Sequence, residues 1–125
     1  MPAQSSFAGS TILIVEDEYL IADDLARDFA GQGATVIGPF ATLDDALERL
    51  DEHRPDMAVL DINLRGDAVF PLADALSARN IPFVFATGYD AGSIPDRFVR
   101  VPRCEKPVRS RALLGALEVE RNARA

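Results

Sequence analysis

The stretch Met57-Ala58-Val59-Leu60-Asp61-Ile62-Asn63 decides the fold predicted for this chain. Four apolar residues run without alternation into one carboxylate, Asp61, and loop-forming residues follow. An uninterrupted apolar run of this length is typical of a strand covered on both faces, as in a parallel sheet between two layers of helices. Sites in such sheets form beyond the carboxyl ends of the strands, so the sequence places Asp61 at a candidate site.

The composition is that of one acidic globular domain. The chain has 125 residues, of which 48% are hydrophobic, and a formal net charge of -7. An acidic surface disfavours nucleic-acid phosphates and anionic lipid, so we expect neither a nucleic-acid nor a membrane partner. No apolar run is long enough for a membrane span, and the first ten residues lack a signal peptide's basic start and apolar core. The single cysteine excludes an internal disulfide. We therefore expect a cytoplasmic protein.

Strand-like segments alternate with helical patterns along the chain. Strands are expected at 11–15, 34–38, 57–61, 82–86 and 98–105. Helices are expected to begin near Tyr19, Leu43 and Val69, and a last helix is expected to end near Arg121. This alternation predicts βαβ units, right-handed crossovers and one parallel sheet. For five strands the common order is 2-1-3-4-5, a doubly wound, flavodoxin-like α/β fold.

Local signals set the expected boundaries. Residues 1–10 are small and polar and are expected to form a disordered tail, followed by a folded domain over 11–121 and a short tail over 122–125. Gly38-Pro39 is expected to end the second strand. Thr42, three residues before Asp45, predicts a helix N-cap, and Asn80 is expected to cap the third helix at its C-terminus.

The pattern weakens after the fourth strand. Tyr89 to Asp96 contains Gly92 and Pro95 and has no apolar stripe, so we expect a fourth helix that is short or poorly formed. Pro102 in the fifth strand removes a ladder donor, which predicts that this strand lies at an edge of the sheet.

Polar side chains follow four of the predicted strands, namely Glu16 and Asp17, Asp61, Thr87 and Lys106. In the order 2-1-3-4-5 these strand ends are neighbours. Three crowded carboxylates would either raise one another's pKa values or require a cation, and oxygen ligands favour Mg²⁺ or a similar hard ion. A lysine and a hydroxyl beside them suit the oxygens of a phosphoryl group. His53 and Cys104 stand alone, so zinc is not predicted, and no glycine-rich phosphate loop follows the first strand.

Glu16-Asp17, Asp61, Thr87-Gly88 and Lys106-Pro107, in this order and at these spacings, resemble the receiver domain of two-component response regulators. The resemblance extends over about residues 11–121, and Phe85-Ala86-Thr87-Gly88-Tyr89 is similar to the FATGUY subgroup of receivers found in alphaproteobacteria.

The resemblance implies a role for each matching residue. Asp61 would be the phosphoacceptor, taking a phosphoryl group from a phosphohistidine of a sensor histidine kinase or a histidine phosphotransfer protein. The Mg²⁺ ligands would be Glu16, Asp17, Asp61 and the backbone carbonyl of Asn63. The phosphoryl group would be held by Thr87 and Lys106, with the small Gly88 beside it. The bond between Lys106 and Pro107 would be cis, as is usual in the family.

One position departs from the family pattern. Receivers usually carry Tyr or Phe three residues before the lysine, and here that position is Arg103. We therefore expect the signal to travel by another route. Our hypothesis is that Tyr89 and the segment after it order when Thr87 is drawn toward the phosphate. Asn63, Arg65 and Tyr89 are expected to tune the rates of phosphotransfer and hydrolysis.

Each site residue has a simpler interpretation when taken alone. Asp61 could cap a turn, Glu16 and Asp17 could interact with a helix dipole, and Lys106 could form a surface ion pair. Their joint occurrence favours a receiver that is not an enzyme beyond its own phosphotransfer and autodephosphorylation. Because the last predicted helix ends near residue 121, we expect no room for an output domain and hence a stand-alone receiver. Its output would pass to an unidentified downstream protein or along a phosphorelay. The alternatives are a phosphorylation-independent binding module of the same fold and a small flavodoxin-like or phosphatase enzyme.

Overall fold

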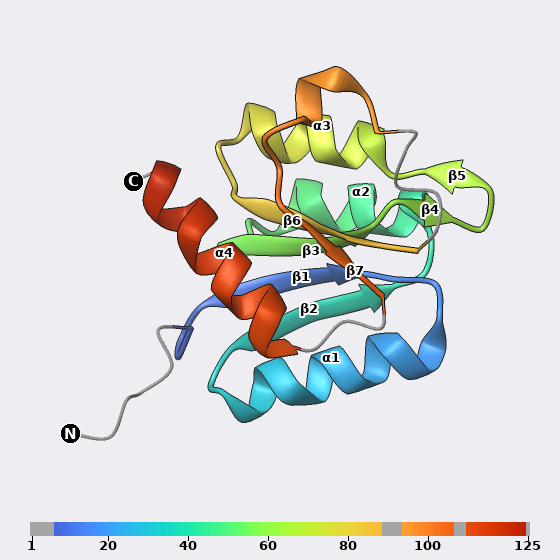
Figure 1. The fold of residues 1–125 in the computed structure, drawn as a ribbon. Helices are drawn as coiled ribbons and strands as arrows, with labels where there is room; N and C mark the ends of the chain where they lie inside the picture. Colours follow the sequence, from blue (N-terminus) through green and yellow to red (C-terminus); the bar gives the residue numbers. More distant parts are fainter. Residues whose placement is uncertain (1–6, 89–93, 107–109, 125) are drawn as a thin grey trace.

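The computed structural model of this chain describes residues 7–88, 94–106 and 110–124. A five-stranded parallel sheet forms its centre, in the order β2-β1-β3-β6-β7 (Figure 1). The strands are β1 (Thr11–Val15), β2 (Thr35–Phe40), β3 (Met57–Asp61), β6 (Phe83–Thr87) and β7 (Arg103–Glu105). These correspond to the five predicted strands, so the doubly wound α/β fold and its 2-1-3-4-5 order are confirmed.

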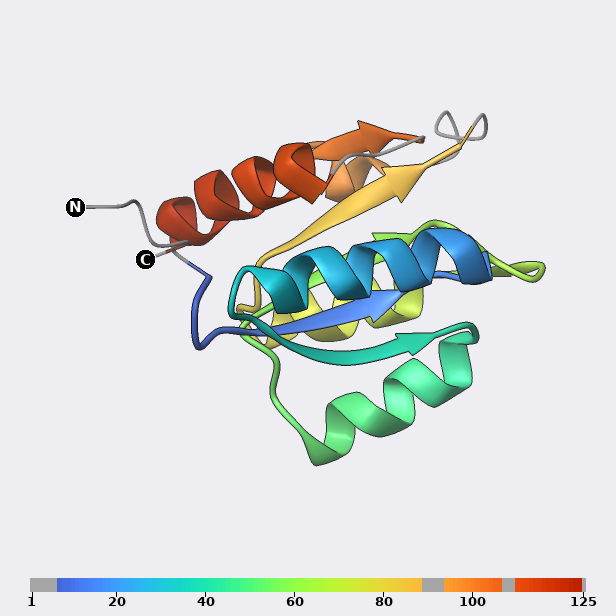
Figure 2. The same cartoon turned by 90° about the horizontal axis from the view of Figure 1, so that it is seen from below.

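Helices cover both faces of the sheet. The helices α1 (Tyr19–Gly31) and α4 (Ser110–Arg124) lie on one face, and α2 (Leu43–Glu52) and α3 (Phe70–Ala78) lie on the other (Figure 1, Figure 2). In β3, Ala58 and Leu60 belong to the core beside α2 and α3, whereas Met57 and Val59 belong to the core beside α1 and α4. Because both sets are buried, the strand has an uninterrupted apolar sequence.

The edge strand β2 differs from its prediction. It continues through Gly38 and Pro39 to Phe40, and its register with β1 shifts where Leu13 pairs with Ile37 but Val15 pairs with Phe40. Gly38 has φ +99°, and a Cβ there would meet the carbonyl oxygen of Ile14 at 2.8 Å. The prediction that Gly38-Pro39 ends the strand is wrong, because glycine accommodates a bulge within it.

The edge strand β7 lies where it was predicted but is shorter. It spans Arg103–Glu105, and Pro102 precedes it, with a carbonyl oxygen that accepts a hydrogen bond from the Phe85 N–H at 3.0 Å. The expected strand from residue 98 is wrong, because Phe98 lies in a 3₁₀ helix, η2 (Asp96–Phe98), and is buried against Phe70, Phe83 and Phe85. The short or poorly formed helix expected over 89–96 stays a prediction for residues 89–93, which lie outside the described residues; residues 94 and 95 are not helical, and η2 begins only at Asp96.

The ends of the domain extend further than predicted. Phe7 is buried, its ring lies 5.2 Å from the Arg121 guanidinium, and the Thr35 N–H donates to the carbonyl of Ser10 at 2.8 Å. The expected disorder of residues 1–10 is therefore wrong for residues 7–10, because Phe7 joins the core beside α1 and α4. The helix α4 also continues to Arg124, past the expected end at 121.

Both predicted helix caps are present. The Asp45 N–H donates to Thr42 Oγ1 at 3.3 Å, and Asn80 follows α3 with φ +55°. Among the described residues, no helix combines the length and the apolar character needed to cross a bilayer.

Candidate functional site

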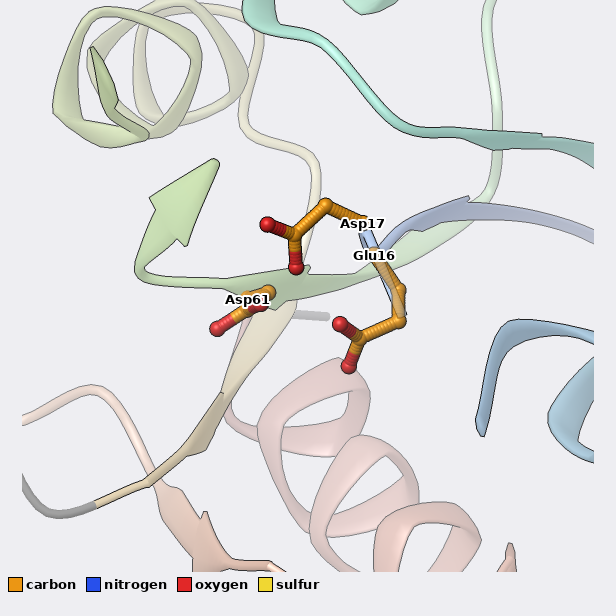
Figure 3. A group of neighbouring side chains, drawn as sticks. All are labelled: Glu16, Asp17 and Asp61. Atoms are coloured by element: carbon orange, nitrogen blue, oxygen red, sulfur yellow. The ribbon is translucent and has the colours of Figure 1, made fainter. Parts of the chain in front are cut away.

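Three carboxylates meet at the carboxyl ends of β1 and β3. Glu16 and Asp17 follow β1 directly, and Asp61 is the last residue of the neighbouring strand β3. One carboxylate oxygen from each lies within 4.8 Å of the others, and Figure 3 shows the three groups converging on one space. Glu16 and Asp61 are buried, whereas Asp17 is partly exposed. The predicted acidic cluster is thus brought together.

Lys106 places a positive charge against this cluster. Its Nζ lies 2.8 Å from Glu16 Oε1 and 3.1 Å from Asp61 Oδ2. The Lys106 N–H donates to the carbonyl of Thr87 at 2.7 Å, which fixes the residue after β7 to the end of β6. The predicted convergence of the strand ends is therefore correct for Lys106 as well.

The charges at the site perturb one another. Burial, reinforced by the hydrogen bond and repulsion from Glu16, raises the pKa of Asp61 to about 7, although Lys106 opposes this rise. Burial works to lower the pKa of Lys106, but its contacts with Glu16 and Asp61 outweigh burial and raise that pKa. For Asp17, burial raises the pKa, while hydrogen bonds to Asp61 and to the Arg65 N–H lower it overall. Without another cation, the cluster does not hold its full negative charge at neutral pH.

A short hairpin supports Asp17 from the β3 side. The strands β4 (Asn63–Leu64) and β5 (Asp67–Ala68) are joined by Arg65 and Gly66, both with positive φ, 54° and 94°. The Arg65 N–H donates to Asp17 Oδ2 at 3.2 Å, and the Gly66 N–H donates to Asn63 Oδ1 at 3.1 Å. Arg65 therefore contacts the site through its backbone. We expected a plain loop here; the Arg-Gly pair between two short segments was the available signal for the hairpin.

A cleft of about 270 Å³ opens over the cluster, lined by Asp17, Glu18, Asp61, Ile62, Asn63, Thr87, Gly88 and Lys106. Thr87 is buried, and its Oγ1 has no hydrogen-bond partner among the described residues. A buried hydroxyl without a partner is costly, and a ligand in the cleft would supply one. Gly88 is exposed at the cleft, as expected of a small residue beside a bound group.

The sequence prediction missed two residues that line the cleft, the buried Ile62 and the charged Glu18. Glu18 Oε1 lies 3.9 Å from Lys106 Nζ, and the Glu18 side chain is 63% exposed. Its N–H donates to Glu16 Oε2 at 3.1 Å, so its backbone is tied to the acidic cluster. The signal that could have identified Glu18 is its position directly after Glu16-Asp17.

The donor set fits Mg²⁺. The cluster Glu16, Asp17 and Asp61 offers only carboxylate oxygens, which hard divalent cations prefer. Asn63 lines the cleft, and the assignment of its backbone carbonyl as a further ligand stays a prediction.

Of the remaining expected residues, only Arg103 is described by the structure, and it does not line the cleft. Arg103 pairs with Phe85 in the sheet and is exposed on the edge strand, away from the residues that line the cleft. Tyr89 and Pro107 lie outside the described residues, so their expected roles and the expected cis bond after Lys106 stay predictions.

Comparison with known proteins defines the class. The family model of the response regulator receiver domain matches residues 12–101, so the chain belongs to the response regulator receiver family. It is similar to SdrG from Sphingomonas melonis Fr1, with 42% identity over 88% of this chain and 97% of that one and a TM-score of 0.77. It is also similar to a BeF3-activated conformation of SdrG from Pseudomonas melonis Fr1, with 41% identity over 94% of this chain and 97% of that one and a TM-score of 0.71.

Curated relatives include longer regulators. The chain is 39% identical over 82 residues to the sensory transduction protein LytT of Bacillus cereus, covering 63% of this chain and 33% of LytT. It is 36% identical over 97 residues to the phyllosphere-induced regulator PhyR of Methylorubrum extorquens, covering 75% of this chain and 34% of PhyR. The matched region therefore spans about a third of these two relatives.

Proposed function

We propose that this chain is a phosphorylation-dependent switch in which Asp61 accepts a phosphoryl group from a phosphohistidine of a sensor histidine kinase or a histidine phosphotransfer protein. The observation that carries this proposal is the contact of Lys106 Nζ with both Glu16 and Asp61, at 2.8 and 3.1 Å. The buried, unpaired Oγ1 of Thr87 lies in the wall of the same cleft. A nucleophile, a cation and a free hydroxyl are thus gathered in one small space.

The reaction requires one bond to form and one to break. A carboxylate oxygen of Asp61 attacks phosphorus, and the bond between phosphorus and the donor's imidazole nitrogen breaks. That nitrogen keeps the electron pair and takes up a proton. Lys106 Nζ would then pair with one phosphoryl oxygen, and Thr87 Oγ1 would donate a hydrogen bond to another. Such placement and charge neutralisation provide most of the rate enhancement in phosphoryl transfer.

Glu16, Asp17 and Asp61 would hold Mg²⁺, with Asn63 contributing a carbonyl oxygen. The bound ion would neutralise the carboxylates and the phosphoryl oxygens. Because the pKa of Asp61 is raised to about 7 without metal, added positive charge would also keep this nucleophile ionised at neutral pH.

The switch would act through other proteins. We propose that it works as a cytoplasmic receiver, with no catalysis beyond its own phosphotransfer and autodephosphorylation. Its output would be a downstream protein or the next member of a phosphorelay.

Beryllofluoride, a phosphoryl mimic, tests the proposal. In ¹H–¹⁵N spectra with Mg²⁺, we expect the amide signals of Thr87 and Lys106 to shift when beryllofluoride is added. The variant Asp61→Asn, which lacks the acceptor carboxylate, is expected to show no such shift. The BeF3-activated conformation known for a protein 41% identical to this chain supports this choice of probe.

Two results would contradict the proposal. Unchanged spectra of the wild-type protein would favour the phosphorylation-independent binding module. Multiple turnovers of a phosphate ester through Asp61 would instead favour a phosphatase.

A further inference from the structure

Glu18 stands at the rim of the phosphoryl site and is used by neither the metal cluster nor the acceptor. Its carboxylate lines the cleft together with Asp61, Thr87 and Lys106, and its side chain is 63% exposed. Its backbone is fixed on both sides: its N–H donates to Glu16 Oε2, and its carbonyl accepts the Ala22 N–H at 2.9 Å. The main chain of Glu18 is therefore fixed at the entrance to the site, and its carboxylate lies 3.9 Å from Lys106 Nζ.

The charge balance at this entrance is unfavourable for an incoming anion. Within the described part of the site there are four carboxylates, counting Glu18, and one ammonium, that of Lys106, which pairs with Glu16, Glu18 and Asp61. When one divalent cation is bound, the four ionised carboxylates still outweigh the combined positive charge of the cation and Lys106. A phosphoryl donor carries further negative charge, so each unneutralised carboxylate near its path slows its entry.

Glu18 also competes for the cation that a phosphoryl group needs. Lys106 Nζ lies 3.9 Å from Glu18 Oε1, in addition to its closer contacts with Glu16 and Asp61. When a phosphoryl group forms on Asp61, Lys106 must turn toward its oxygens. The attraction of Glu18 then opposes that movement, and its carboxylate repels the same oxygens.

We propose that Glu18 is a specificity-determining residue that acts as an electrostatic brake on small anionic phosphodonors. This inference rests on the proposed function. A donor that brings less negative charge, or that presents a cationic side chain opposite Glu18, is admitted more readily than a free dianion. Glu18 thereby favours transfer from a donor protein over non-specific phosphorylation by small metabolites.

Two small donors of different charge test this proposal. Acetyl phosphate is a dianion at neutral pH, and phosphoramidate is a monoanion. At saturating Mg²⁺ and low salt, we expect Glu18→Gln to increase the rate of phosphorylation by acetyl phosphate by roughly three- to tenfold, and the rate with phosphoramidate by a smaller factor. Beryllofluoride affinity is expected to rise by about threefold, and all these differences should shrink in 1 M salt.

Three comparisons separate charge from other causes. Glu18→Asp keeps the charge and is expected to behave much like the wild type. Glu118→Gln removes the same charge from an exposed position on α4 and is expected to change neither rate. The affinity for Mg²⁺ alone, measured by calorimetry, should change by less than about twofold in Glu18→Gln, because Glu18 is not one of the three clustered carboxylates.

The outcomes distinguish this inference from the proposed function. If wild-type protein responds to beryllofluoride but Glu18→Gln and Glu118→Gln are alike, the brake is overturned and the switch stands. A large loss of Mg²⁺ affinity in Glu18→Gln would make Glu18 a metal ligand and would also overturn the brake. If the wild type takes up neither phosphoryl groups nor beryllofluoride, both proposals fail.

Discussion

The two halves of the site are built in different ways. On the β1–β3 side, Glu16, Asp17 and Asp61 end central strands, and backbone N–H groups of Glu18 and Arg65 hold two of these carboxylates. On the β6–β7 side, Thr87 has an unpaired hydroxyl, and Lys106 follows an edge strand of three residues. The first half is a fixed negative cluster. In the second half, the Thr87 hydroxyl has no hydrogen-bond partner among the described residues, so this is the half that a ligand can complete.

The responding half is supported by aromatic packing. Phe98 in η2 lies 5.8 Å from Phe85 of β6, measured between ring centroids, and 5.6 Å from Phe70 of α3. The Arg97 guanidinium binds both carboxylate oxygens of Asp74 on α3, at 2.9 and 3.0 Å. Among the described residues, this packing connects β6 to the surface of α3, while Arg103 occupies the position of the usual switch aromatic.

The largest effect is expected for Lys106→Met, which removes the cation shared by both halves. Two buried carboxylates lose their partner, so the metal-free protein should lose about 3 kcal/mol of unfolding free energy in urea titrations. Phosphorylation by acetyl phosphate should fall by at least about a hundredfold, because the phosphoryl oxygens lose their counter-charge.

Mg²⁺ should restore much of the stability that Lys106→Met loses, because the ion replaces the missing positive charge. For the same reason, Mg²⁺ should bind Lys106→Met more tightly than the wild type. Arg111→Met, which removes an exposed cation of α4, serves as the control and should change little. Equal loss of stability in both variants would contradict the shared-cation account.

The next largest effect is expected for Phe98→Ala, which should weaken the β6–β7 side of the site without changing the carboxylate cluster on the β1–β3 side. Phe98→Ala removes a buried ring from the aromatic cluster and should cost about 3 kcal/mol of stability, with faster amide exchange in residues 94–102. Mg²⁺ affinity should stay within about twofold of the wild type, because the three carboxylates lie on the other half of the site.

Phe98→Leu should lose less stability than Phe98→Ala, because it keeps most of the buried volume. A collapse of Mg²⁺ affinity in Phe98→Leu would show that the halves are not separable.

Much of this site could be predicted from the sequence, because the informative residues follow strands that are readily recognised. The apolar run before Asp61 and the β-branched run before Glu16-Asp17 are local signals, and parallel topology brings their ends together. The shorter β7 and the buried Phe98 could not be predicted in this way. Phe98 packs against Phe70 and Phe83, which are distant in the sequence, and the strand can begin only after this buried residue.

Two further features depend on backbone geometry. The bulge at Gly38 is set by a close approach to the Ile14 carbonyl, which leaves no pattern in the side chains. The support of Asp17 by Arg65 uses a main-chain N–H, so the identity of the arginine side chain gave no information about this contact.

A change of pH is expected to alter the stability of the protein by a smaller amount, through Asp61 on the β1–β3 side of the site. Burial raises the pKa of Asp61 to about 7 in the folded state, from an ordinary value of 3.8. The folded state then holds this proton more tightly than the unfolded state. The Asp61 contribution to stability is therefore greatest below about pH 4, falls as pH rises to about 7, and is fully lost above that value.

Between pH 5 and pH 8, after a discount for solvent screening of Asp61 at the open cleft, we expect the metal-free wild type to lose roughly 2 kcal/mol of unfolding free energy, and Asp61→Asn to show no such loss. Urea titrations at pH 5 and pH 8 with chelator measure it. Mg²⁺ should stabilise the wild type more at pH 8 than at pH 5. A wild type and Asp61→Asn with parallel pH profiles would contradict the assigned pKa.

The smallest effect is expected for Arg97→Gln. The ion pair with Asp74 is exposed, so its loss should change global stability little. Amide exchange in residues 94–98 should nevertheless become faster, because η2 loses a link to α3. Arg27→Gln removes a comparable exposed pair with Asp23 on α1 and should leave that exchange unchanged. Unaltered exchange in Arg97→Gln would mean that Phe98 alone holds η2.

The most direct test of the central claim is chemical identification of the phosphorylated residue. The protein is incubated with acetyl phosphate and Mg²⁺, and the acyl phosphate is reduced with borohydride, which converts the modified aspartate to homoserine. Peptide mass spectrometry should locate this change at Asp61, and omission of Mg²⁺ or the substitution Asp61→Asn should abolish it. Homoserine at another aspartate, or at Asp61 in equal amount without Mg²⁺, would contradict the account.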